Sequence, residues 1–186
     1  MFMFDVETMD VESTSVILSA AIIKFELDDK KSFQDYVDDA CFVKFDVNQQ
    51  VRDHKRTMTK ETINWWKRQS EIARHVSLVP SDDDMNAKDG LTVIKNYINK
   101  NGGSNTLFWA RGSLDQMVID SLCKSAGVEL LANFNKWRDV RTAVDLLATN
   151  SVEGYCKVKN FNMDSVLKHD PRQDCALDIM MLLHHE

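Results

Sequence analysis

The stretch that decides the fold lies at the start of the chain and reads Phe4-Asp5-Val6-Glu7, followed by Thr8. Side chains alternate between the two faces of a strand, so Asp5 and Glu7 share one face, while Phe2, Phe4 and Val6 face the core. Neighbouring carboxylates repel each other unless a cation lies between them. Mg²⁺ and Mn²⁺ prefer oxygen ligands of this kind. An edge strand with a solvated acidic face has the same pattern, so this stretch alone leaves both interpretations open.

Length and composition are those of an ordinary globular protein. The chain has 186 residues, of which 44% are hydrophobic and 28% charged, and we expect one domain over residues 1–186. No apolar run reaches the ~18–20 residues that a membrane span needs. The N-terminus lacks the basic and apolar pattern of a signal peptide. The four cysteines are scattered without a CxxC pair, which argues against zinc and predicts a reducing, cytoplasmic location.

The charge is unevenly distributed along the chain. The net charge of −6 is not typical of a nucleic-acid-binding protein, yet one segment is rich in bases: Arg52, Lys55, Arg56, Lys60, Lys67 and Arg68. A metal-dependent enzyme that acts on a phosphate chain needs acids at the metal and bases along the phosphates. A solvated helix face has a similar composition, so the basic segment is weak support by itself.

The order of the predicted elements indicates an α/β fold. Strands are expected at 2–8 and 15–25 and within 33–45, which predicts three antiparallel strands before any helix. Further elements are expected in alternation: helices 59–69 and 85–100, a strand at 106–110, a helix from Ser113 to about 126, a strand at 137–141, and helices at 143–148 and from Pro171. This order predicts a mixed sheet, antiparallel at first and then parallel, flanked by helices.

Capping residues define the starts of several helices. Thr59 is the expected N-cap of the 59–69 helix, and the acids at 82–84 are expected to cap the next one. Ser113 and Gln116 fit a capping box. Asp115 then falls in the first turn, just after a strand, where the helix dipole favours a carboxylate and where α/β sheets build their sites. Acids are common in first turns, so Asp115 alone remains ambiguous.

The last informative stretch is His169-Asp170-Pro171-Arg172-Gln173-Asp174. Asp170 fits the N-cap, Pro171 the first helical position, and Gln173 a second capping box. Asp174 is then held in the first turns of the final helix. His169 lies just before the cap, close to Asp174 but outside the helix, which suits a general base. Read singly, each of these residues could be an ordinary surface residue.

Taken together, these features resemble a known family. An Asp-x-Glu on the first strand, an acid opening a central helix and His-x-x-x-x-Asp at the final helix are the pattern of the DEDDh group of 3′-to-5′ exonucleases, the DnaQ-like branch of the ribonuclease H-like fold. Asp170 stands where the tyrosine variant of that group has its tyrosine. Four stretches resemble the branch that contains exonuclease A of T-even bacteriophages: 53–56, 59–67, 138–142 and 169–181. A bacterial branch of the same family acts on RNA. Pro171 replaces the small residue of many members.

The resemblance implies an activity and a set of site residues. Asp5, Glu7, Asp115 and Asp174 are expected to bind two Mg²⁺ or Mn²⁺ ions, with His169 as the base that deprotonates water. The substrate would be the 3′ end of single-stranded nucleic acid, DNA before RNA, and the product a nucleoside 5′-monophosphate. The expected substrate contacts are Thr8 and Met9 beneath the terminal sugar and base, Trp65 or Trp66 stacked on a base, and Arg111 with the bases of 52–68 on phosphates.

Several alternatives stay open at this point. The chain could be an exoribonuclease, because no motif reveals a contact to the 2′-OH. A catalytically silent nucleic-acid-binding module and another ribonuclease H-like phosphotransferase are further alternatives, both disfavoured by the full set of acids with His169. The oligomeric state also stays open: relatives often form homodimers, but no heptad or exposed apolar stripe in this sequence indicates one. The terminal His184-His185-Glu186 is assigned no role.

Overall fold

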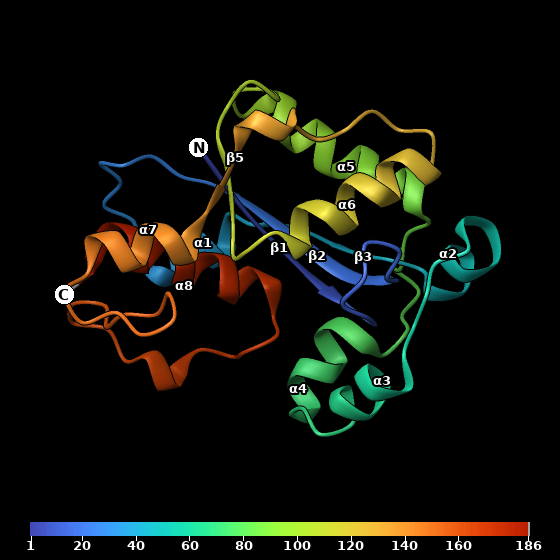
Figure 1. Cartoon of the computed structure of the whole chain (residues 1–186), viewed down its shortest axis with the longest axis horizontal. Helices are drawn as coiled ribbons and strands as arrows, with labels where there is room; N and C mark the ends of the chain where they lie inside the picture. Colours follow the sequence, from blue (N-terminus) through green and yellow to red (C-terminus); the bar gives the residue numbers. More distant parts are fainter. Residues whose placement is uncertain (186) are drawn as a thin grey trace.

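The computed structural model describes residues 1–185, and Glu186 lies outside them. Within these residues five strands form one mixed sheet in the order β3-β2-β1-β4-β5 (Figure 1). The strands are β1 (Phe2–Thr8), β2 (Ile17–Lys24), β3 (Cys41–Lys44), β4 (Phe108–Ala110) and β5 (Trp137–Asp139). β1 pairs antiparallel with β2 and parallel with β4. It is therefore the central strand, and the solvated-edge interpretation of Asp5 and Glu7 is wrong.

The opening of the fold differs from the prediction in one respect. β2 and β3 pair antiparallel as expected, but helix α1 (Phe33–Asp38) lies between them. The predicted strand within 33–45 is confirmed by β3, but the prediction of three strands before any helix is wrong, because residues 33–38 form α1. Ser32 accepts a hydrogen bond from the Asp35 N–H, and the Asp35 carboxylate accepts one from the Ser32 N–H. This capping box starts a helix where the apolar pattern favoured a strand.

Helices cover both faces of the sheet (Figure 1). α5 (Ala87–Lys100) and α6 (Leu114–Ser125) enclose one core with Phe2, Phe4 and Val6 of β1. α7 (Val140–Leu147), α8 (Pro171–His184) and α1 enclose the second core, which contains Met3 of β1. Because side chains alternate along β1, Asp5 and Glu7 lie on the α8 face with Met3. None of the helices within residues 1–185 is long and apolar enough to cross a membrane.

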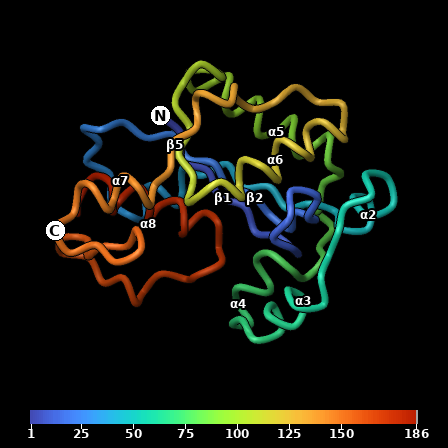
Figure 2. Tube along the Cα trace, in the orientation of Figure 1, coloured from blue at the N-terminus to red at the C-terminus, as the bar shows by residue number. Residues whose placement is uncertain are grey.

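A group of short helices lies beside the C-terminal end of β1, as the trace in Figure 2 shows. These helices are α2 (Val47–His54), α3 (Lys60–Trp66), α4 (Glu71–Ala73) and the π-helix η1 (Arg74–Leu78); two 3₁₀ turns, η2 (Phe134–Lys136) and η3 (Met163–Ser165), occur later. A small third core of Met9, Val16, Leu18 and Trp66 joins this group to the sheet. The Thr59 N–H also donates to the Met9 carbonyl. The segment after β1 is therefore fixed against α3.

The predicted helix starts are confirmed in part. Thr59 caps α3, which ends at Trp66 rather than at 69. Asn86, not the acids at 82–84, caps α5. Ser113 stands at the N-cap of α6 but makes no capping hydrogen bond, because its backbone is helical (φ −99°, ψ −12°) instead of extended. The predicted capping box at this helix is therefore absent.

The two last helices also begin at capping aspartates. Asp139 accepts from the backbone N–H groups of Arg141 and Thr142, so α7 starts at Val140 and the preceding strand is shorter than predicted. Asp170 caps α8, and Pro171 occupies its first turn as expected. Gln173 does not close a capping box, because its side-chain oxygen accepts from the Leu167 N–H outside the helix.

Candidate active site

Four predicted residues meet where β1 passes the start of α8. Asp5 and Glu7 project from β1 toward α8, whose first turn carries Asp174, and His169 directly precedes the helix. One ligand atom each from Glu7, His169 and Asp174 lies within 4.8 Å of the other two. The Asp5 Oδ2 atom is buried and has no hydrogen-bond partner among the described residues. A polar oxygen left in this state is rare in proteins unless an ion or water binds it.

Asp115 joins the cluster from α6, across the sheet. Its Oδ1 accepts a hydrogen bond of 3.2 Å from the Val6 N–H, which lies between the two acids of β1. The side chain is 6% exposed, and burial raises the pKa of Asp115 to about 7. The position in the first turn of α6, predicted from the sequence, thus brings this carboxylate to the backbone between Asp5 and Glu7.

The acids destabilise one another's charged forms. Burial, followed by the charges of Asp115 and Asp174, raises the pKa of Asp5 well above its ordinary range. Burial and then the charge of Glu7 raise the pKa of Asp174 to about 7. Buried carboxylates in such a group need a positive charge among them to ionise together. Their carboxylate oxygens are the ligand type that Mg²⁺ and Mn²⁺ prefer. The residues present therefore fit a divalent-metal site.

His169 is held by its backbone and leaves its ring free to face the acids. Its φ of 66° is left-handed, its N–H donates to Asp174 Oδ2 at 2.9 Å, and its carbonyl accepts from Ser77 Oγ of η1 at 3.3 Å. The ring Nδ1 lies 3.4 Å from Glu7 Oε1. The hydrogen bond with Glu7 raises the pKa of His169. Its ring also meets the ring of Trp65 edge-on, with centroids 4.7 Å apart.

These side chains line a cavity of about 910 Å³. All five predicted catalytic residues border it, together with three of the predicted substrate contacts, Thr8, Trp65 and Arg111. The volume lies in the range of pockets that hold ligands of nucleotide size. Sequence reasoning missed other lining residues, namely Asp10, Arg141, Tyr155, Lys168 and Asp178.

Two predicted substrate contacts lie in the core instead. Trp66 is fully buried, and its Nε1 donates to the Thr8 carbonyl at 2.9 Å. Met9 is 5% exposed and packs in the same small core. Neither residue borders the cavity. Adjacent helical residues point about 100° apart, so only one of Trp65 and Trp66 can face the cavity. That residue is Trp65.

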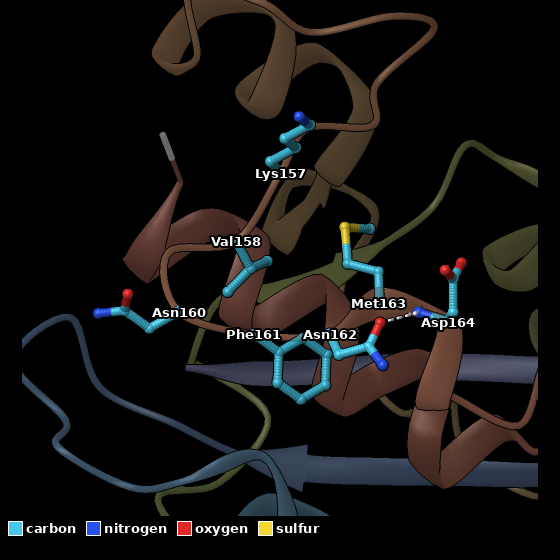
Figure 3. Close-up of a pocket in the computed structure, with 7 residues that line it drawn as sticks. All are labelled: Lys157, Val158, Asn160, Phe161, Asn162, Met163 and Asp164. Atoms are coloured by element: carbon cyan, nitrogen blue, oxygen red, sulfur yellow. Dashed lines mark hydrogen bonds between the residues drawn. The ribbon is translucent and has the colours of Figure 1, made fainter.

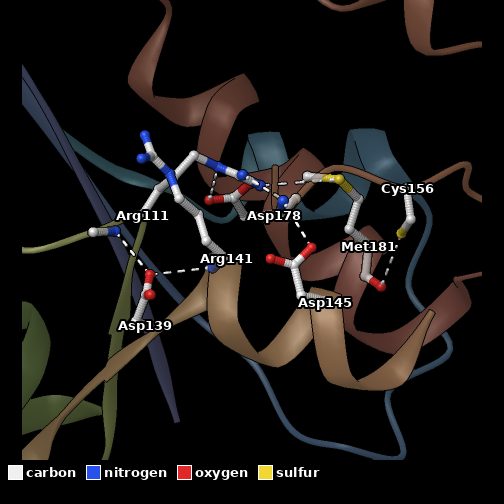
Figure 4. A network of polar contacts seen from close by, with 9 residues as sticks. Arg111, Asp139, Arg141, Asp145, Cys156, Asp178 and Met181 are labelled. Carbon is white, nitrogen blue, oxygen red and sulfur yellow. Dashed lines mark hydrogen bonds and ion pairs between the residues drawn. The ribbon is translucent and has the colours of Figure 1, made fainter. Parts of the chain in front are cut away.

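Two of the bases predicted to contact phosphates bind other groups of the protein instead. Arg111 donates to both oxygens of Asp178 on α8 and to the Gly154 carbonyl (Figure 4). Arg56 is 5% exposed and donates to main-chain oxygens of Ser15 and Val118, so it stabilises the fold and cannot reach a phosphate. Among the bases of 52–68, Arg68 borders the cavity. The prediction that the bases of 52–68 contact phosphates is therefore wrong for Arg56. Apart from Arg68, the other bases of this segment do not border the cavity.

Asp178 is a further buried carboxylate that borders the cavity. It lies one helical turn after Asp174, is 7% exposed, and has a pKa raised by burial. The i, i+4 spacing of two acids on a predicted helix could have indicated that both share one face. Nothing local in the sequence could have identified Arg111 as its partner, because the two lie 67 residues apart.

A second hollow of about 490 Å³ lies in the loop before α8 (Figure 3). Its lining is Lys157, Val158, Asn160, Phe161, Asn162, Met163 and Asp164. Asp164 is the single acid in this set, and no predicted site residue borders the hollow. The acid-lined cavity is therefore the candidate active site.

The mixed sheet, with paired acids on its central strand and further acids from α6 and α8, defines a ribonuclease H-like exonuclease fold. A family model described as "3'-5' exoribonuclease Rv2179c-like domain" matches residues 1–182, and the chain belongs to this family. The chain is also similar to a protein named exodeoxyribonuclease from Enterobacteria phage T4. The two are 31% identical over 199 aligned positions, which cover 97% of this chain and 86% of the phage protein. The predicted relationship to 3′-5′ exonucleases is confirmed.

Proposed function

We propose that the chain, as one domain over residues 1–186, removes nucleotides from the 3′ end of single-stranded nucleic acid with the help of two divalent ions. DNA is the preferred substrate, and nucleoside 5′-monophosphates are the products. The observation that carries the proposal is the convergence of Asp5, Glu7, Asp115, His169 and Asp174 on one cavity. These five residues come from three separate parts of the chain, so the meeting of the three parts is not a consequence of local sequence.

The carboxylates of Asp5, Glu7, Asp115 and Asp174 are the proposed metal ligands. The unpartnered Asp5 Oδ2 supports this assignment, and so do the pKa values of Asp115 and Asp174, which burial and neighbouring acids raise and which a cation among the carboxylates would lower. Bound Mg²⁺ or Mn²⁺ supplies Lewis acidity, which lowers the pKa of the attacking water and offsets charge on the attacking and leaving oxygens. The chain contributes the spacing and the burial of these oxygens.

His169 is the proposed general base. Its Nδ1 faces Glu7 Oε1, which orients the ring and leaves Nε2 to accept a proton from the attacking water. The hydrogen bonds at its backbone N–H and carbonyl keep the residue beside Asp174 without placing it in α8. A base requires a neutral ring, and the hydrogen bond with Glu7 opposes the neutral form by raising the pKa of His169, so activity should increase as the pH rises and the ring loses its proton.

The choice of DNA rests on the phage relative. That protein is named an exodeoxyribonuclease, and its similarity extends over nearly all of this chain. The family description names an exoribonuclease, so RNA is the second candidate. Discrimination between the sugars requires a contact at the 2′-OH. We propose Thr8 for a contact to the terminal sugar, and its position at the cavity directly after the two acids of β1 supports this role.

The decisive experiment is a timed digestion of matched single-stranded DNA and RNA oligonucleotides that carry a label at the 5′ end, with Mn²⁺ or Mg²⁺. We expect a ladder that shortens from the 3′ end. His169→Ala should abolish it, whereas His75→Ala, which removes an exposed histidine outside the cavity, should not. The faster substrate decides between DNA and RNA. No shortening of either strand by the wild type would favour a binding module, and cleavage of a circular strand would favour an endonuclease.

The cysteines support a proposal for the cellular setting. All four, Cys41, Cys123, Cys156 and Cys175, lie in the described residues and are free. Free thiols in this number are typical of a reducing compartment, and we propose that the enzyme acts in the cytoplasm, that of the host if the gene belongs to a phage. A homodimer stays a prediction, which sedimentation velocity can test.

A further inference from the structure

A strained turn projects from the loop between α7 and α8 at the cavity. Val152 and Tyr155 exchange backbone hydrogen bonds of 2.8 and 3.0 Å. The two residues between them have left-handed backbones, with φ of 53° at Glu153 and 79° at Gly154. This is the geometry of a type I′ turn, in which glycine and asparagine are favoured and glutamate is not. A side chain in this region of backbone space persists only where the surroundings enforce it, and such positions gather at functional sites.

The surroundings enforce this turn from three elements (Figure 4). The Gly154 N–H donates to Asp145 Oδ1 of α7 at 2.9 Å, and its carbonyl accepts from Arg111 Nη1 at 2.9 Å. Arg111 follows β4 and is itself bound to Asp178 of α8. The turn also lies so close to α7 that a Cβ atom on Gly154 would be 2.5 Å from Cβ of Arg141. The turn is thus fixed to the same helix that carries Asp174.

The side chain that this turn presents to the cavity is Tyr155. It is 48% exposed and borders the same cavity as the catalytic acids. The guanidinium carbon of Arg111 lies 4.0 Å from the centroid of its ring, over one face. The ring is therefore oriented by a stacked cation that is itself held in place. A half-exposed aromatic ring on so constrained a support is well suited to bind a planar group without further loss of freedom.

We propose that residues 152–155 form a clamp that presents the Tyr155 ring as a stacking surface for one base of the strand in the cavity. The inference rests on the proposed function and adds to it a residue that determines how the strand lies. Trp65 borders the cavity from α3, so the strand would meet aromatic rings from two separate parts of the chain. Arg111 acts as a positioning residue for Tyr155 rather than as a phosphate ligand. Stacking on a ring tolerates all bases, which suits an exonuclease.

The test measures binding apart from hydrolysis. In the His169→Ala background with Mg²⁺, the dissociation constants of short DNA and RNA strands labelled with fluorescein at the 5′ end are measured by anisotropy. Tyr155→Ala should weaken binding by about fivefold to a hundredfold, the range that one stacked base contributes. Tyr155→Phe should bind within about twofold of the background protein, because it keeps the stacking ring. Phe134→Ala is the matched control, because it removes an aromatic ring that is 83% exposed and outside the cavity.

Strands with a single abasic position identify stacking as the cause. At the position whose base stacks on Tyr155, the abasic strand should bind the background protein more weakly, and Tyr155→Ala should add no further loss. A loss from Tyr155→Ala that is equal for every abasic position, or no loss at all, would overturn the clamp while leaving the proposed function intact. Failure of every strand to bind, with no digestion by the wild type, would overturn both.

Discussion

The two walls of the cavity are supported in different ways. The α3 wall, with Thr8 and Trp65, rests on the apolar core around Trp66 and on hydrogen bonds between uncharged groups, such as those from Trp66 Nε1 to the Thr8 carbonyl and from the Thr59 N–H to the Met9 carbonyl. The opposite wall, with Tyr155, rests on the polar contacts of Arg111 with Asp178 and Gly154. Apolar packing is insensitive to charge, whereas a buried ion pair becomes a liability once either partner is lost. Different substitutions should therefore destabilise the two walls.

The largest effect on activity should come from substitution of the catalytic acids, which lie between the two walls. Asp5→Asn keeps the shape of the side chain but removes a proposed metal ligand, so we expect kcat to fall at least about a thousandfold, corresponding to several kcal/mol of lost transition-state stabilisation. The same change removes one of the repelling charges and should raise the melting temperature of the metal-free protein. Digestion kinetics and thermal melts measure the two effects. Asp164→Asn, in the second hollow, is the control; an active, unstabilised Asp5→Asn protein would contradict the assignment.

The next effect separates the walls directly. Arg111→Ala leaves Asp178 buried without its partner, which typically costs about 3–5 kcal/mol of unfolding free energy. The double variant Arg111→Ala with Asp178→Asn should recover part of that loss, because no unpaired charge remains. Urea unfolding measures both. On the α3 wall, Trp66→Ala should lower the free energy of unfolding by a similar amount, because it leaves a void in the small core. Asp178→Asn should not restore that loss. Equal rescue of both walls would show that the distinction is wrong.

Metal binding should stabilise the region between the walls in a pH-dependent way. The pKa values of Asp115 and Asp174 are raised from 3.8 to about 7. The free energy of unfolding of the metal-free protein should therefore fall as the pH rises between these two values, and the acids should cost no stability at lower pH. The gain in melting temperature from Mg²⁺ should thus grow between pH 4 and pH 7. With the ion at about a hundred times its dissociation constant the gain approaches ~2.7 kcal/mol, or roughly 5–10 °C for a chain of this size. A gain that is independent of pH, or no gain and no effect of EDTA, would contradict the metal site.

The smallest effect should come from the exposed side of the α3 wall. Trp65→Ala removes a ring that borders the cavity and packs edge-on against His169. If the ring stacks on a base, KM should rise by an amount equivalent to about 1–3 kcal/mol, and Trp65→Phe should recover most of it. Steady-state kinetics on the labelled DNA strand give KM and kcat separately. A fall in kcat alone would instead assign Trp65 to the orientation of His169.

The sequence was sufficient for features that depend on local spacing. The separation of Asp5 and Glu7 placed both on one face of β1, and Pro171 after Asp170 located the start of α8 and hence Asp174. The apolar run of residues 15–25 predicted β2. Each of these inferences uses neighbours in sequence, whose geometry is fixed by the period of the strand or helix.

Features that depend on distant partners could not be predicted. Trp65 and Trp66 are equivalent in sequence, and only the packing of α3 on β2 decides which one is buried. The pairing of Arg111 with Asp178 joins segments 67 residues apart, so the local sequence around Arg111 favours a phosphate contact and does not reveal its acidic partner. Tyr155 lies in a loop without periodicity, where the sequence gives no direction for a side chain. The missed helix α1 shows that a short capping box can outweigh an apolar pattern.

The π-helix η1 makes the length of one short segment critical. Its i→i+5 hydrogen bond, from the Val79 N–H to the Arg74 carbonyl, encloses one residue more than an α-helical turn, and this turn brings Ser77 to the carbonyl of His169. Deleting a single residue from 74–78 would restore a regular α-helix and rotate Ser77 by about 100°. The proposed base would then lose one of its two backbone anchors. This segment, although it contains no proposed catalytic residue, should tolerate substitutions on its surface far better than any change in the number of its residues.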